Sequence, residues 1–240
     1  MFFRRKTYDL IFGLGEACSC SSSLRSSDLQ IQSFPFDWIF GSTFVDRTKI
    51  LCDDFSSFIH RNSLEKRGNN GIAAHLCDIY EDTSNGLVFN HDFPADCEFE
   101  EYFDKVFLKY HRRSERLLRL AKHSDKILVV WVDSPGSNWK PKNDEDFKKG
   151  LELLQNKFPK AKVDLLIFSW RQDLPYRKRI HEKISDNIEK YTFDYRFYHK
   201  RKVIPDYVVN EKLLGKILKK YQLKMTLKER FDNFLFKRKK

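Results

Sequence analysis

The sequence has no run of apolar residues close to the roughly 20 that a helix needs to cross a bilayer. Residues 1–6 are followed at once by a strand-like stretch with polar residues, not by the apolar core of a signal peptide. We therefore expect a cytoplasmic protein. With 240 residues and 41% apolar content, the chain can build one domain with a substantial core.

Cysteine is scarce, and its spacing shows no pairs. The five cysteines form an odd set without a CxxC motif: Cys18, Cys20, Cys52, Cys77 and Cys97. This pattern argues against a zinc ribbon and against a disulfide framework, so we expect reduced thiols and no metal. Glycine is sparse too, and Gly13-Leu-Gly15 lacks both the third glycine of a dinucleotide fingerprint and a P-loop lysine. No cofactor is predicted.

Positive charge is in excess, formally +11, and much of it lies in residues 200–240. Such a run is commonly a solvated face, but it could also contact anionic lipid or a polyanionic substrate. We therefore allow peripheral contact of the basic C-terminus with an anionic membrane as one alternative. No nucleic-acid-binding motif accompanies the charge, so no nucleic-acid partner is expected.

Apolar runs alternate with amphipathic segments along the chain. Residues 9–15, 127–132 and 163–168 predict buried strands, and residues 43–59, 102–121 and 143–158 have helical spacing. Residues 61–71 indicate an exposed loop, and residues 191–198 a strand at or near a sheet edge. Two apolar strands joined by a crossover helix are typical of a parallel βαβ unit.

These patterns predict an α/β fold with a mostly parallel central sheet flanked by helices. We place a single domain at residues 1–209 and a basic, helical C-terminal extension at residues 210–240. The extension would present two apolar faces: Leu213, Leu214, Ile217 and Leu218, then Phe231, Phe234 and Leu235.

Cys18 is the first candidate for chemistry. It follows the first predicted strand and a glycine turn, and serines able to start a helix come directly after it. Ligands of open α/β sheets bind outside the carboxyl ends of the strands. A helix start also favours a thiolate and offers N–H groups to an oxyanion. The sequence therefore predicts a nucleophile at Cys18, with a buried structural cysteine as the alternative.

A thiol nucleophile needs a base. His91 ends a short apolar run that could deliver it to a loop-built cleft, and Asp92 stands next to it. Side chains one residue apart in a strand face opposite ways, so Asp92 can orient the imidazole only if the backbone turns there. A histidine without a function is the alternative.

Four further residues are candidates for substrate binding. Asp37 lies between large apolar side chains beside Trp38, where a carboxylate tends to be partnered or functional, though it could also cap a helix. Arg113 falls on the apolar face of its predicted helix, next to Arg112, and a cation there needs a carboxylate or phosphate partner.

Several of these motifs, in order, resemble an uncharacterised bacterial family described as papain-like cysteine peptidases and often encoded among surface-polysaccharide genes. The resemblance spans roughly residues 7 to 135 and rests on these blocks: Tyr8-Asp-Leu-Ile-Phe-Gly-Leu-Gly-Glu-Ala-Cys18, Phe34-Pro-Phe-Asp-Trp-Ile39, Phe89-Asn-His-Asp-Phe93 and Tyr110-His-Arg-Arg-Ser-Glu-Arg116. It implies Cys18 as nucleophile, His91 as base and Asp92 as orienting residue. Papain-like enzymes carry the cysteine on a central helix beside an antiparallel sheet, whereas this sequence predicts it after a strand of a parallel sheet.

Two functions of different classes follow. The first is a cysteine-dependent acyl hydrolase or acyltransferase, of the papain-like peptidase kind, that acts on a glycan or other acyl-bearing substrate in the assembly of bacterial capsular polysaccharide. The second is a glycan- or sugar-phosphate-binding protein, or a glycosyl or phosphoryl transferase. In that case Asp37, Arg112 and Arg113 line the site and Cys18 only packs.

Overall fold

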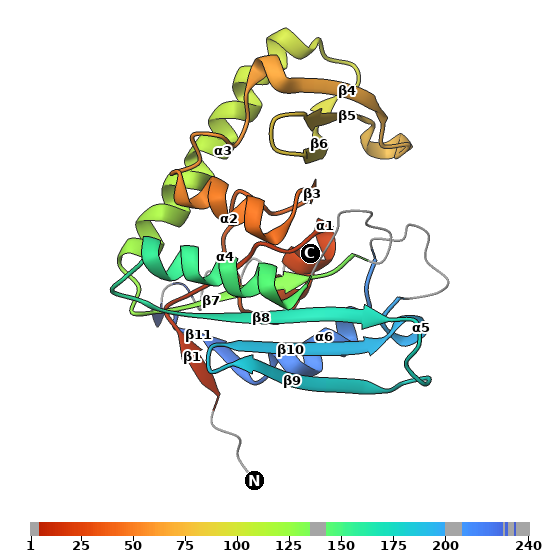
Figure 1. Ribbon diagram of the computed structural model, residues 1–240. Coiled ribbons are helices and arrows are strands. Elements are labelled where there is room, and N and C mark those ends of the chain that lie inside the picture. The colour runs from red at the N-terminus through yellow and green to blue at the C-terminus, as the bar shows by residue number, and fades with distance from the viewer. Residues whose placement is uncertain (1–4, 135–142, 200–207, 228, 230–232, 234–240) are drawn as a thin grey trace.

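The structure is a computed structural model that describes residues 5–134, 143–199, 208–227, 229 and 233. Its strands form three sheets (Figure 1). A central sheet of five strands occupies one half of the molecule, and an antiparallel sheet of four strands occupies the other. The long helix α3 (Phe99–Lys122) leads from the antiparallel sheet to the central one.

The central sheet has the order β2-β7-β8-β10-β9. Its strands are β2 (Leu10–Gly13), β7 (Lys126–Val132), β8 (Lys162–Arg171), β10 (Ile188–Asp194) and β9 (Arg179–Ser185). Neighbours from β2 to β10 are parallel, and β9 is antiparallel to β10. Strands β7 and β8 are buried over nearly their whole length, which explains their continuous apolar sequence.

Helices cover both faces of this sheet because alternate strand residues point to opposite sides. Val129 and Ile167 belong to a core cluster shared with α2 (Phe44–Cys52), α3 and α4 (Asp144–Lys157). Val130 and Phe168 belong to a second cluster, shared with α1 (Ala17–Ser26) and α6 (Glu211–Leu218). The short α5 (Tyr195–Tyr198) follows β10. The predicted helices near residues 43–59, 102–121 and 143–158 are thus confirmed in position.

The antiparallel sheet has the order β3-β6-β5-β4. It consists of β3 (Ile39–Gly41), β6 (Leu87–Pro94), β5 (Cys77–Asp82) and β4 (Leu64–Asn69), with the 3₁₀ turns η1 (Arg61–Ser63) and η2 (Ala73–His75) between them. A small parallel pair joins β1 (Lys6–Tyr8) to β11 (Tyr221–Leu223).

The structure corrects two predictions about strands. The central sheet is mixed and not mostly parallel, because the polar strand β9 pairs with β10 as an antiparallel edge. The predicted exposed loop at residues 61–71 contains β4, which is exposed along its length and therefore carries no apolar alternation by which the sequence could reveal it.

The predicted helical extension at residues 210–240 is not confirmed. Helix α6 buries Leu213, Leu214, Ile217 and Leu218 as expected, but the chain then enters β11 and pairs with β1. The second predicted helix face and the basic end lie outside the described residues, so contact with a membrane stays a prediction from the sequence. Within the described part, no helix is long and apolar enough to cross a membrane.

We predict that Gly15→Ala destabilises the fold by about 3 kcal/mol, at the upper end of overpacking costs. A Cβ at Gly15 would lie 2.3 Å from the backbone nitrogen of Val132, so β2 and β7 would have to separate. Urea unfolding measures the effect. Gly215→Ala in α6 is the matched control, since its Cβ would meet only Ser27 Oγ at 3.9 Å. Equal unfolding midpoints for the two variants would contradict the prediction.

Candidate functional site

The turn that carries Cys18 is built against strand β7. The N–H groups of Leu14 and Gly15 both donate to the carbonyl of Val130, at 3.0 and 3.2 Å, and the N–H of Glu16 donates to Val132 at 3.2 Å. Helix α1 then starts at Ala17, whose φ of 59° is unusual for a residue with a side chain. This sharp reversal places half-buried Cys18 in the first turn of α1, as the sequence predicts.

A buried guanidinium fixes this turn. Arg47 of α2 is fully buried, and within the described residues its side-chain hydrogen bonds go to backbone carbonyls. It donates to Leu14 and Gly15, at 3.1 and 3.0 Å, and on its other side to Ile39 and Gly41 of β3. Burial lowers the pKa of Arg47 to about 10, against the charge of nearby Glu16, which raises it. Arg47 therefore ties the Cys18 turn to the antiparallel sheet and remains charged at neutral pH.

His91 comes from a bulge in β6. Phe89 pairs with Tyr80 and Phe93 with Asp78, so three residues of β6 lie opposite one residue of β5. Bulges of this kind re-aim side chains and are frequent beside functional sites. The bulge turns the backbone at Asn90, His91 and Asp92. The sequence predicts His91 at the end of a short apolar run, but it lies instead inside β6 of the antiparallel sheet.

The two sheets bring Cys18 and His91 together. Cys18 Sγ lies 3.7 Å from His91 Nε2, a distance at which a thiol can donate its hydrogen to the imidazole. The two residues proposed from the sequence as nucleophile and base thus lie in contact. The thiol stands at a helix start after β2, a strand parallel to β7, as the sequence predicts, and in this it departs from the papain plan. The imidazole stands on an antiparallel strand.

Asp92 does not hydrogen-bond to His91. Its Oδ1 is bound by the Lys109 ammonium, and its Oδ2 accepts from the Tyr110 hydroxyl at 2.8 Å. Its negative charge still raises the pKa of His91, although burial lowers that pKa by more. Asp92 therefore acts on the imidazole by charge, while its hydrogen bonds fix β6 to α3.

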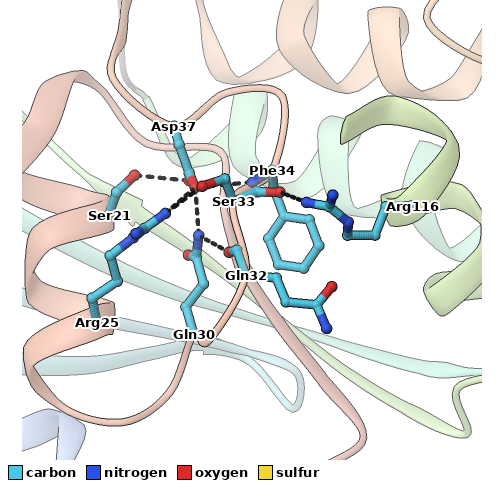
Figure 2. Close-up of polar contacts among 8 residues, drawn as sticks. All are labelled: Ser21, Arg25, Gln30, Gln32, Ser33, Phe34, Asp37 and Arg116. Atoms are coloured by element: carbon cyan, nitrogen blue, oxygen red, sulfur yellow. Dashed lines mark hydrogen bonds and ion pairs between the residues drawn. The ribbon is translucent and has the colours of Figure 1, made fainter. Parts of the chain in front are cut away.

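Asp37 organises the loop before β3 (Figure 2). It is fully buried and accepts from Ser21 Oγ at 2.8 Å, from Gln30 Nε2 at 2.6 Å and from the N–H of Phe34 at 2.9 Å. Arg25 approaches the same carboxylate at 3.4 Å. Burial raises the pKa of Asp37, whereas the Phe34 N–H, Ser21 and the charges of Arg25 and Arg113 oppose the rise. The side chain therefore holds the loop before β3 to α1.

Helix α3 closes the other side of this loop. In Figure 2 the Arg116 guanidinium reaches from α3 to the carbonyl of Ser33, a hydrogen bond of 2.8 Å. The loop is thereby held between α1 and α3, and Trp38, with a φ of 70°, is presented at its end.

One pocket collects most of the predicted residues. It has a volume of about 450 Å³ and is lined by Cys18, Asp37, Trp38, His91, Asp92, Lys109, Tyr110 and Arg113. Arg112, also a candidate, is exposed and does not line it. The sequence analysis missed Lys109 and Tyr110. The spacing of Lys109, Arg113 and Arg116 along α3, four and three residues apart, could have revealed one basic helix face.

The thiol and the imidazole are both neutral at pH 7. Burial raises the pKa of the Cys18 thiol to about 11, although its own N–H acts in the opposite direction. Burial also lowers the pKa of His91 below its ordinary value. The site at rest therefore differs from the thiolate that the helix start alone predicts. His91 is in the form that can accept a proton.

Cys20 has a different role. It is fully buried, and its thiol donates to the carbonyl of Val130 at 3.6 Å. A Cβ at Gly13 would come within 2.7 Å of Cys20 Sγ, so this cysteine fills the space beside β2. Its position is that of a packing residue.

Fold and site together define a class: an α/β protein with a helix-borne cysteine facing a histidine across one pocket. Residues 9–138 match the model of the family described as "Putative papain-like cysteine peptidase (DUF1796)". Since this match covers more than half of the chain, the protein belongs to that family. No curated protein and no solved structure matches the chain.

We predict that the alkylation rate of Cys18 by iodoacetamide keeps rising with pH toward about 11, the pKa to which burial raises this thiol. A raised pKa leaves less thiolate at neutral pH, so the rate at pH 7 should be far below that of the same cysteine in urea, whose pKa is about 8.5. Mass spectrometry at Cys18 follows the reaction. A plateau already at pH 6 to 7 would instead indicate a preformed thiolate-imidazolium pair.

We also predict that Arg47→Met lowers the free energy of unfolding by about 3 to 5 kcal/mol, because several buried carbonyls lose their donor. Urea unfolding measures the loss. Lys49→Met is the control on the same helix, and its exposed ammonium should matter by no more than about 0.5 kcal/mol. Similar losses in both variants would contradict the role assigned to Arg47.

Proposed function

We propose that the protein is a cysteine-dependent acyl hydrolase of the papain-like peptidase kind, with Cys18 as nucleophile and His91 as general base. The observation that carries the proposal is the 3.7 Å contact between Cys18 Sγ and His91 Nε2 inside a pocket. The membership of the chain in a family described as cysteine peptidases supports it.

The reaction would proceed from the neutral pair. His91 Nε2 takes the thiol proton while Cys18 Sγ bonds to the carbonyl carbon of the substrate. The tetrahedral intermediate then breaks its bond to the leaving amine or alcohol, which receives the proton from His91. The negative charge of Asp92 stabilises the imidazolium that exists between these two steps. Water, deprotonated by the same histidine, cleaves the thioester and restores the thiol.

The proposed oxyanion donors are backbone N–H groups at the start of α1, where the sequence leads us to expect them. The N–H groups of Gly15 and Glu16 already donate to β7. The first N–H groups of α1, at Ala17 and Cys18, precede the first intrahelical bond and point out of the helix start. Within the part of the chain that the structure describes, no other residue accepts a hydrogen bond from them, so they are the proposed donors to an oxyanion formed at Cys18.

An acyl acceptor other than water would make the protein an acyltransferase by the same steps. The chemistry of a thioester at Cys18 is the same for an amide or ester substrate, including an acylated glycan. A role in surface-polysaccharide assembly is the expectation that the family resemblance adds. It sets the kind of substrate to be screened first.

The second candidate is an anion- or sugar-phosphate-binding protein in which Cys18 only packs. The raised pKa of Cys18 favours it, since a neutral thiol is a weak nucleophile without its base. The two candidates differ in whether Cys18 becomes acylated.

Acetylation by p-nitrophenyl acetate decides between them. We predict a burst of p-nitrophenolate and an acetyl group on Cys18 by mass spectrometry, because an activated ester needs no specific leaving-group contacts. Cys18→Ala should remove the burst, and His91→Gln should slow it by about 10² to 10⁴, the usual worth of a general base.

Cys97→Ala is the matched control, since Cys97 is the exposed cysteine of the described chain and should be dispensable. A full burst in folded Cys18→Ala protein would refute the nucleophile assignment and leave the binding protein as the better candidate.

A further inference from the structure

The charged groups around the Cys18 pocket do not balance. Asp92 is neutralised by Lys109, with which it forms an ion pair. Asp37 also lines the pocket and forms its ion pair with Arg25, while the charge of Arg113 acts on it without a direct contact. When these two pairs are set aside, one ionised side chain that lines the pocket is left, the guanidinium of Arg113.

Arg113 has no acceptor within the part of the chain that the structure describes. Its guanidinium stacks on the ring of Tyr110, whose centroid lies 5.4 Å from the guanidinium carbon, and its charge acts on Asp37. A guanidinium has five N–H donors in one plane, which suit the two oxygens of a carboxylate or a phosphate. Stacking on an aromatic face holds that plane without using any donor.

The orientation of Tyr110 is itself fixed. The residue is fully buried, and its hydroxyl donates to Asp92 at 2.8 Å. Burial raises its pKa well above the ordinary value, so the hydroxyl keeps its proton and the hydrogen bond persists. The platform under Arg113 is therefore rigid, and the cation is preorganised for a ligand.

The rest of the pocket suits an acyl group. Trp38 forms a half-buried aromatic wall, and Arg25 covers its ring at 5.7 Å. The nucleophile, an apolar wall and an unpaired guanidinium thus share a space of about 450 Å³. A neutral acyl chain would leave the Arg113 donors without a partner, which is costly because the side chain is partly buried.

The geometry points to an anionic substrate: the acyl group attacked by Cys18 carries a carboxylate or phosphate that binds Arg113. This inference rests on the proposed function, because it takes Cys18 as the reacting group. Arg113 is then a specificity-determining residue, and it selects acidic over neutral acyl groups.

Two small alkylating agents test the inference without knowledge of the natural substrate. Iodoacetate carries a carboxylate and iodoacetamide is its neutral analogue, and both alkylate a thiol by the same displacement of iodide. Their rate ratio at Cys18 is measured by fragment-ion mass spectrometry at pH 8. We expect the ratio of the iodoacetate rate to the iodoacetamide rate to be at least ~5-fold higher in the folded protein than in urea. A single attractive charge a few ångströms from the reagent has an effect of this size.

Arg113→Gln should return the ratio to the urea value. Arg112→Gln is the matched control, since it removes the same charge from the next residue, which is exposed and outside the pocket. Arg113→Lys keeps the charge and should retain part of the preference, so the test survives even if Arg113→Gln folds poorly. An equal ratio in wild type, Arg113→Gln and urea overturns the inference.

Protection of Cys18 from iodoacetamide identifies the anion. If acetate protects more strongly, the result supports a carboxylate substrate; if inorganic phosphate protects more strongly, it supports a phosphorylated substrate. In either case Arg113→Gln must abolish the protection. Failure of the proposed function has a different signature. In that case p-nitrophenyl acetate leaves no acetyl group on Cys18, while anion protection through Arg113 persists.

Discussion

The buried guanidinium of Arg47 is the constraint on which the site depends. It binds carbonyls of the turn before Cys18 and carbonyls of β3 in the antiparallel sheet. A fully buried cation is tolerated only when its donors are satisfied, and here backbone carbonyls supply the acceptors. These carbonyls belong to the Cys18 turn and to β3. One side chain therefore sets the position of the turn relative to the antiparallel sheet, which carries His91.

Helix α3 provides the second connection between the sheets. Its residues reach Asp92 of β6 through Lys109 and Tyr110, and reach the loop before β3 through Arg116. One helix face therefore holds both segments that surround Cys18. The same face leaves Arg113 directed at the pocket, so the scaffold and the proposed specificity residue come from one element.

Burial of the thiol and the imidazole also sets the chemistry of the pocket. Burial raises the pKa of the thiol and lowers that of the imidazole, so each group is neutral before substrate arrives. Proton transfer is then coupled to bond formation and is not completed in advance. An anionic substrate fits this electrostatic state, because Arg113 can hold a negative charge that a preformed thiolate would repel.

The sequence by itself determined the elements and the chemically relevant residue types. Strands and helices with strong apolar periodicity, such as β7, β8 and α3, could be read directly because burial dictates their pattern. Cys18 and His91 could be singled out from their local settings and from the family resemblance. Exposed strands such as β4 and β9 could not be predicted from the sequence, since a strand in solvent needs no alternation of apolar and polar residues.

Only the tertiary structure decided which residues meet. The bulge in β6 arises from pairing with β5 and is invisible in local sequence, yet it turns His91 toward Cys18 and Asp92 toward Lys109 and Tyr110. Asp37 became a loop support and Arg112 an exposed residue through long-range packing. Such roles depend on hydrogen bonds and packing between segments far apart in the chain. A sequence pattern indicates only the secondary structure that each segment favours locally.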